Sequence, residues 1–247
     1  SCDMGVILGT GTNACYPEKT GRLAKGLFPL PRQEMILNLE WGNFDKLDTN
    51  ACDQALDRMT LNPGCQRMEK MVSGMYIGEL VRLILLDMTD QGILLQEKHR
   101  PVLAREHSVS SEQMSLSALG EDFFAAIGIP DVSDRDRDAA AHVCRIVSRR
   151  SARIAGAALA AVVAWMDAHL EKKHTIAIDG SLFEKYPGYP ENMRCVLEEF
   201  FACRADRISL CTTSDGSGIG AAIIAAVASF GQEQKHKPAL PRIRKNR

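Results

Sequence analysis

Two glycine-rich segments have the composition of turns that hold a phosphate. Residues 9–13 read GTGTN between two short apolar runs, so they offer backbone N–H groups, two hydroxyls and a carboxamide. Residues 215–218 read DGSG and precede an apolar segment of helical composition, which would aim helix-terminal N–H groups at a docked anion. Ordinary glycine turns are the alternative interpretation of both segments.

Neither segment fits the best-known nucleotide motifs. No Lys-Ser or Lys-Thr pair directly follows the glycines of the first, and a strand rather than a helix is expected after it, so it is not a P-loop. The second has glycines spaced G-x-G-x-G, which is not the dinucleotide pattern. A third turn, DGS at residues 179–181, ends a predicted strand, and we expect it to lie beside the 215–218 turn.

Glu40 and Glu69 are acids in largely apolar surroundings. A buried carboxylate is costly unless it is paired or hydrogen-bonded, and a polyol would satisfy it because each carboxylate accepts two hydroxyl donors. Asn13 would add a donor and an acceptor. The alternative is that Glu69 pairs with Lys70 or Arg67 on an exposed helix and that Glu40 is solvated. The six histidines lack H-x-x-x-H spacing, so we expect no metal site built from protein ligands.

The elements that must position these residues follow an α/β order. Apolar runs bounded by turn residues predict strands at 5–8, 14–16, 35–39, 175–178 and 208–211. Helical periodicity predicts one long helix over 68–92 and further helices at 135–169, 191–203 and 219–230. We expect a loop over 17–32 and a loop or short helix over 97–117. Three opening strands followed by β-α-β-α predict a mixed sheet with ligands at the ends that carry glycine turns.

Composition excludes several classes of protein. The 247 residues are 45% hydrophobic and 25% charged, which is typical of a folded globular chain and not of disorder or a fibre. A net charge of -1 gives no reason to expect a nucleic-acid partner. The longest uncharged apolar run, residues 154–166, is too short to cross a bilayer, so no membrane span is predicted. Eight scattered cysteines indicate reduced thiols and a cytoplasmic location.

The two ends of the sequence differ from its middle. The chain begins on Ser1 and enters an apolar run within a few residues, so we expect it to be part of a longer protein. Residues 235–247 hold six Lys or Arg and no acid, which predicts a basic, disordered tail behind one domain over residues 1–234.

Six segments, in order, resemble the eukaryotic-type hexokinase and glucokinase family of the actin-like ATPase superfamily. They are residues 9–16, 38–44, 62–71, 73–80, 179–182 and 215–218. The resemblance spans residues 5–230 and implies an α/β, ribonuclease H-like lobe, namely the large C-terminal lobe of that family.

The resemblance also implies a function and the residues that serve it. Members of the family are ATP-dependent hexose kinases that use Mg²⁺. They phosphorylate the 6-hydroxyl of glucose or a related hexose, which is the first step of glycolysis. Asn13, Glu40 and Glu69 would contact the hexose. The nucleotide would be held by Thr10, Gly11 and Thr12 at the β- and γ-phosphates, and by Gly180, Ser181, Gly216, Ser217 and Gly218 near the adenosine and α-phosphate.

The departures from the family pattern concern catalysis. In the family, an N-terminal lobe that precedes this segment carries the Asp that takes the proton from the attacking hydroxyl, so we expect no catalytic residue in this chain. Phosphoryl transfer depends on alignment, which half of a two-lobed clamp is not expected to provide alone. Two alternatives stay open: a catalytically silent sugar-binding regulator, and an actin-like nucleotide module in which Glu40 and Glu69 bind no sugar.

Overall fold

The computed structural model describes residues 2–23 and 33–235 of the chain. Contacts between residues divide the chain into two units, Ser1–Thr212 and Thr213–Arg247, and each unit is described by itself. Among the described residues, no helix is long and apolar enough to span a membrane.

The first unit is built on a five-stranded mixed sheet with strand order β3-β2-β1-β4-β5. The strands are β1 (Met4–Leu8), β2 (Thr12–Lys19), β3 (Glu34–Asn38), β4 (His174–Asp179) and β5 (Ile208–Thr213). The first three pair antiparallel, and β4 pairs parallel with β1. The predicted α/β fold with three opening strands and a mixed sheet is therefore confirmed.

Alternation along the strands decides which side of the sheet is covered. Val6 and Leu8 on β1, and Ile176 and Ile178 on β4, are buried, whereas Ile7 is 42% exposed. This is the period-two pattern of strands that have one well-covered face. The buried side chains belong to one core cluster, which continues into the helices.

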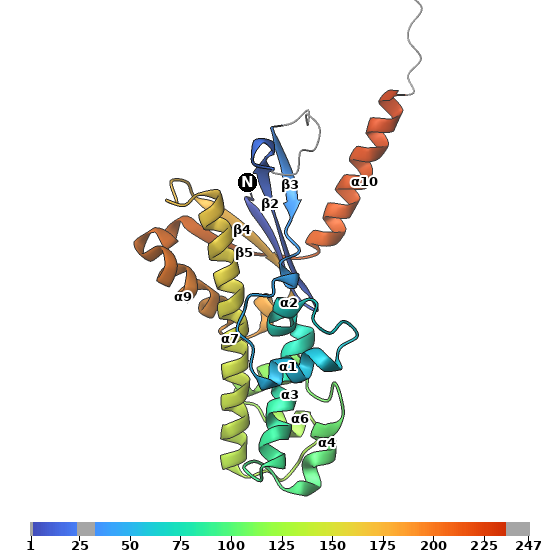
Figure 1. Cartoon of the computed structure of the whole chain (residues 1–247), viewed down its shortest axis with the longest axis vertical. Helices are drawn as coiled ribbons and strands as arrows, with labels where there is room; N and C mark the ends of the chain where they lie inside the picture. The colour runs from blue at the N-terminus through green and yellow to red at the C-terminus, as the bar shows by residue number, and fades with distance from the viewer. Residues whose placement is uncertain (1, 24–32, 236–247) are drawn as a thin grey trace, which may run out of the picture. The chain divides into compact units, whose positions relative to one another are not determined.

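Nine helices belong to this unit among the described residues, together with four short 3-10 turns. They are α1 (Ala51–Met59), α2 (Arg67–Val72), α3 (Gly74–Asp90), α4 (Arg100–Ala104), α5 (Ser111–Ala118), α6 (Phe123–Ala126), α7 (Asp134–Met166), α8 (Ser181–Lys185) and α9 (Tyr189–Phe201). The 3-10 turns are η1 (Thr20–Arg22), η2 (Trp41–Asn43), η3 (Glu97–His99) and η4 (Ala202–Arg207). In Figure 1 the 33-residue helix α7 runs past the group formed by α1 to α6 and reaches the sheet. At that end, Trp165 donates its indole N–H to Glu18 of β2 at 2.7 Å.

The prediction of one helix over 68–92 is wrong, because the helix is interrupted at Ser73, whose backbone is extended. The N–H of the next residue, Gly74, donates to the carbonyl of Gly9 at 2.8 Å, outside any helix. A Cβ on Gly74 would lie 3.2 Å from that carbonyl oxygen. The interruption therefore brings the start of α3 against the loop after β1.

Other predicted boundaries also need correction. The loop expected over 17–32 begins later, because β2 continues to Lys19 and η1 follows; residues 24–32 lie outside the described residues. Helix α1 was not predicted, although Asn50 and Asp53 form a capping box at its start. The expectation of a loop or short helix over 97–117 is confirmed, because the region forms η3, α4 and most of α5.

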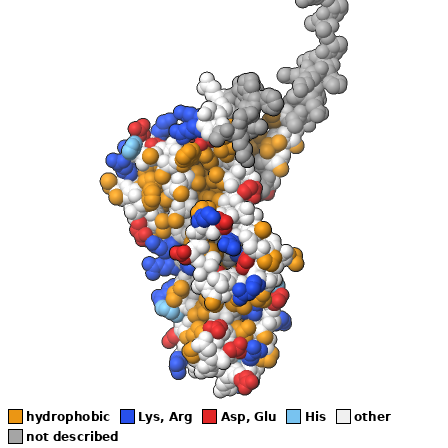
Figure 2. Space-filling model, viewed as in Figure 1, with side chains coloured by type: hydrophobic (Ala, Val, Ile, Leu, Met, Phe, Trp, Pro, Cys, Tyr) orange, Lys and Arg blue, Asp and Glu red, His pale blue; other side chains and the backbone are white. Residues whose placement is uncertain are grey.

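The surface carries both signs of charge. On the face in Figure 2, acidic and basic side chains are interspersed over the lower helices, and basic side chains gather along the middle of α7. This mixture agrees with the net charge of -1.

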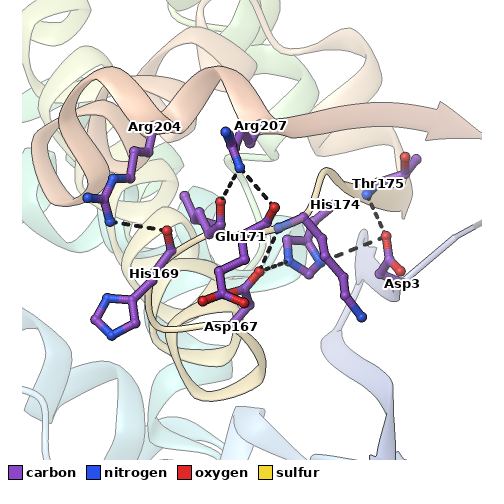
Figure 3. Close-up of polar contacts among 10 residues, drawn as sticks. Asp3, Asp167, His169, Glu171, His174, Thr175, Arg204 and Arg207 are labelled. Carbon is purple, nitrogen blue, oxygen red and sulfur yellow. Dashed lines mark hydrogen bonds and ion pairs between the residues drawn. The ribbon is translucent and has the colours of Figure 1, made fainter.

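Polar contacts fix the N-terminal ends of β1 and β4 (Figure 3). Asp3 pairs with Thr175 twice: its backbone N–H donates to the Thr175 carbonyl at 2.8 Å, and its carboxylate accepts the Thr175 N–H at 2.9 Å. The neighbouring His174 lies 3.2 Å from the carboxylate of Asp167. These contacts hold the register in which Ile7 lies opposite Asp179. The turns that follow both strands consequently lie at the same edge of the sheet.

The second unit contains α10 (Gly216–Lys235). Residues 236–247, which make up nearly all of the predicted basic tail, lie outside the described residues. The predicted domain boundary at residue 234 stays a prediction.

Candidate functional site

The loop between β1 and β2 is closed by its own backbone and by a neighbouring turn. The N–H of Gly9 donates to the carbonyl of Gly11 at 3.0 Å. From the other side comes Gly180, with a φ of 141°, where a Cβ would lie 2.1 Å from the carbonyl oxygen of Leu8. Only glycine allows this conformation and this close approach. The structure thus brings the predicted phosphate loop and the turn after β4 into direct contact.

A small hollow lies beside the turn after β4. Ser181 is exposed at the first position of α8 and lines a hollow of about 180 Å³ together with Ser111 and Lys185. Ser111 also lies close to Gly74, whose N–H bonds the phosphate loop, because a Cβ on Gly74 would lie 3.2 Å from the Ser111 hydroxyl. The sequence analysis missed Ser111, since nothing in its local pattern separates it from the other serines nearby.

The remaining predicted nucleotide residues belong to the second unit. Gly216, Ser217 and Gly218 form the first turn of α10. Asp215 precedes them with a φ of 55°, and its carbonyl accepts the N–H of Ile219 at 3.0 Å. The expectation that this turn lies beside residues 179–181 stays a prediction, because the two units are described separately.

Two carboxamides contact Glu40, the first of the two acids predicted to bind sugar. The Asn13 side-chain amide donates to Asn38 Oδ1 at 2.8 Å and to Glu40 Oε1 at 3.1 Å. Asn38 donates to the same oxygen of Glu40. Glu40 itself is exposed, so the expectation of a buried acid is wrong here; the carboxylate is open to solvent and oriented by its neighbours.

Glu69, the second acid predicted to bind sugar, reaches the phosphate loop from α2. Glu69 is half-buried, and its Oε2 accepts the backbone N–H of Thr12 at 2.9 Å. A Cβ on Gly11 would lie only 2.7 Å from the same oxygen. The alternative pairing of Glu69 with Lys70 is wrong, because the Lys70 ammonium bonds the Asp57 carboxylate at 2.7 Å. Asn13, Glu40 and Glu69 therefore gather around the start of β2.

The turn that carries Glu40 packs against the start of α2. A Cβ on Gly42 would lie 2.6 Å from Gln66 Oε1 and 3.2 Å from the Cβ of Glu69. The Gln66 backbone N–H also donates to Asn43 Oδ1 at 3.1 Å. The sequence analysis did not select Gln66 or Asn38 as site residues. Asn38 lies two positions before Glu40, but Glu40 follows the end of β3 in a left-handed conformation, so strand alternation gives no signal for it.

The charge of the site is carried by these carboxylates. Burial and the nearby Glu69 carboxylate both raise the pKa of Tyr76, the third residue of α3. Among residues 2–23 and 33–235, no cluster of three His, Cys, Asp or Glu could hold a metal ion. The arrangement is thus two acids with carboxamide and amide donors next to a glycine loop, which suits a neutral polyol beside a phosphate.

Comparisons with known proteins agree with this arrangement. A family model described as hexokinase matches residues 3–227. Hexokinase-7 of Oryza sativa subsp. japonica is 36% identical over 242 residues, covering 92% of this chain and 52% of that protein. Hexokinase-1 of Spinacia oleracea is 37% identical over 239 residues, covering 90% of this chain and 48% of that protein.

Solved structures are similar as well. The hexokinase of Schistosoma mansoni in complex with glucose superposes with a TM-score of 0.80 at 30% identity, covering 92% of this chain and 53% of that one. This chain spans about half the length of these relatives. With a family model that matches most of its residues, the chain belongs to the hexokinase family.

Proposed function

We propose that this chain is the hexose- and nucleotide-binding half of an ATP-dependent hexose kinase that phosphorylates the 6-hydroxyl of glucose or a related hexose. The observation that carries the proposal is the contact between the two glutamates predicted to bind sugar and the phosphate loop. Glu69 bonds Thr12, and Glu40 bonds the adjacent Asn13. Acceptors for sugar hydroxyls thus meet the glycine loop at the start of β2.

The hexose end would use Asn13, Glu40 and Glu69. Carboxylates accept hydroxyl donors strongly, and the carboxamides of Asn13 and Asn38 hold the Glu40 carboxylate in one orientation. A hexose bound there would have its hydroxyls paired on several sides. This geometry supports a sugar but does not discriminate among hexoses that differ at one hydroxyl.

The nucleotide end would use Thr10 and Gly11 for the terminal phosphates and Gly180 and Ser181 for the adenosine side. The role of Gly216, Ser217 and Gly218, which belong to the second unit, stays a prediction. Gly180 supports this assignment. Because it has no Cβ, the turn after β4 can lie directly against the backbone of the phosphate loop. Bound Mg-ATP supplies the phosphoryl group and Mg²⁺ neutralises its charge. The hollow beside Ser181 is large enough for part of an adenosine.

For the whole protein we propose a cytoplasmic enzyme at the first step of glycolysis. The support for the compartment is that all eight cysteines are free, including five that are exposed. Exposed free thiols are typical of proteins kept in a reducing environment.

A glucose titration followed by tryptophan emission tests the hexose end. Trp41 is next to Glu40 and 8% exposed, and Trp165→Phe removes the other fluorophore. We expect a saturable change in emission that Glu40→Gln weakens about tenfold or more, because the charged acceptor is lost. Glu34→Gln, an exposed acid at the start of β3, serves as the control and should change nothing. A flat trace from a chain that melts cooperatively would contradict the proposal.

A further inference from the structure

Thr12 is buried at the point where the phosphate loop enters β2. It is the first residue of β2, and only 5% of it is exposed, whereas Thr10 in the loop is exposed. The backbone N–H and the side-chain hydroxyl of Thr12 are both paired within the protein. Its backbone N–H donates to Glu69 Oε2 at 2.9 Å, and its hydroxyl oxygen accepts the indole N–H of Trp41 at 3.0 Å.

These two bonds connect Thr12 with the two glutamates predicted to bind sugar. Glu69 is bonded directly, and Trp41 directly follows Glu40 in the chain. Gly42 also packs against this point, since its Cβ would lie 3.2 Å from the Thr12 carbonyl oxygen. Thr12 is therefore the residue at which α2, the turn with Glu40 and the phosphate loop meet.

The turn that carries Glu40 needs an anchor. Glu40 has a φ of 50°, a left-handed conformation that is strained for a residue other than glycine. Such a conformation persists only where its surroundings hold it. The buried bond between Trp41 and Thr12 fixes the residue immediately after Glu40 and so holds the turn in place.

We propose that Thr12 is a positioning residue for the hexose end of the site and not a ligand of the nucleotide phosphates. It holds Glu69 through its amide and Glu40 through Trp41. This inference rests on the proposed hexose-binding function. It assigns Thr12 to the opposite end of the site from the one that the family resemblance implies.

Thr12→Val tests the assignment, because valine keeps the branched shape and the amide but removes the acceptor for Trp41. Calorimetry would measure the affinity for glucose and, separately, for the Mg²⁺ complex of the non-hydrolysable analogue AMP-PNP. We expect glucose affinity to fall about tenfold, which corresponds to the loss of one buried hydrogen bond. AMP-PNP affinity should stay within about twofold, and Thr12→Ser, which keeps the hydroxyl, should restore glucose binding.

Two further variants guard the interpretation. Thr89→Val removes a buried hydroxyl from α3, where it bonds the Leu85 carbonyl, and it should alter neither affinity. Trp41→Phe removes the donor while Thr12 stays intact, so it should repeat the pattern of Thr12→Val even if that variant fails to fold.

The opposite outcomes overturn the inference. Weaker AMP-PNP binding with unchanged glucose binding would make Thr12 a phosphate ligand. An equal loss of both affinities that serine does not rescue would leave Thr12 a purely structural residue. If the unaltered chain itself binds no glucose, the proposed function fails. This outcome differs from failure of the inference, which shows only in the variants.

Discussion

Two residues of the site adopt backbone conformations that ordinary side chains avoid. Glu40 and Gln66 have φ values of 50° and 52°, and Gly42 packs against the side chain of Gln66. A left-handed conformation costs a non-glycine residue roughly 1–2 kcal/mol. Strain of this kind concentrates at binding sites, where neighbouring contacts over-determine the geometry. At the residue scale, Glu40 and Gln66 therefore depend on neighbouring contacts that hold their backbone in place.

Asp167, a residue outside the site, is expected to make the stability of the fold depend on pH. Burial raises the pKa of Asp167, but backbone N–H donors of Glu171 and Lys172 and the contact with His174 outweigh it, which lowers the pKa to about 2 (Figure 3). Because the folded pKa lies below the unfolded value, the stabilisation is complete above about pH 4 and is lost as the pH falls through about 2.

Asp167→Asn should remove this contribution. We expect the free energy of unfolding in urea at pH 7 to fall by about 2 kcal/mol. The difference from the unaltered protein should shrink as the pH is lowered from 4 toward 2. Asp206→Asn is the control, since the Asp206 side chain is 92% exposed and should contribute little. A difference that is the same at pH 7 and at pH 2.5 would contradict the assignment.

At the scale of elements, α3 connects the phosphate loop with the segment that leads into α5. Its first residue, Gly74, bonds the phosphate loop, and its fifth, Gly78, packs on the segment that leads into α5. A Cβ on Gly78 would lie 2.3 Å from the carbonyl oxygen of Val109, which is backbone and cannot rotate away. The helix and the segment before Ser111 therefore approach more closely than any other residue at position 78 allows.

Gly78→Ala should destabilise the fold despite the higher helix propensity of alanine. The clash is expected to cost about 1–3 kcal/mol net, measured as the free energy of unfolding in urea. Gly220→Ala in α10 is the matched control, because no atom lies within 4 Å of a Cβ built there and the change should be neutral or slightly stabilising. Equal effects of the two substitutions would show that packing on Val109 is not the cause.

The sequence predicts the elements better than their interruptions. Hydrophobic periodicity located all five strands and α7, because burial on one face is a local pattern. It missed the interruption at Ser73, since a hydrogen bond from Gly74 to Gly9 joins segments that are distant in the chain. The same reason applies to Thr12: its bonds to Trp41 and Glu69 decide its role, and no spacing in the sequence reveals them.

At the scale of the whole molecule, length decides what the chain can do alone. Its hexokinase relatives are about twice as long, since it covers 52% of the rice protein and 53% of the Schistosoma one. In the proposed function, the described residues would supply acceptors for a sugar and a loop for phosphate. Phosphoryl transfer additionally needs the attacking hydroxyl to be aligned and water to be excluded, and these tasks require groups on both sides of the substrates.

We therefore expect the purified 247-residue chain to form no hexose 6-phosphate from glucose and Mg-ATP in a coupled dehydrogenase assay. Full-length rice Hexokinase-7 is the positive control. Joining this chain to the half of the rice protein that it does not match should restore turnover, and Glu40→Gln in that chimera should abolish it. A chimera that binds glucose but stays inactive would favour the silent sugar-binding relative. Turnover by the chain alone that disappears with Glu40→Gln would instead contradict the expectation and show that one half already aligns the reacting groups.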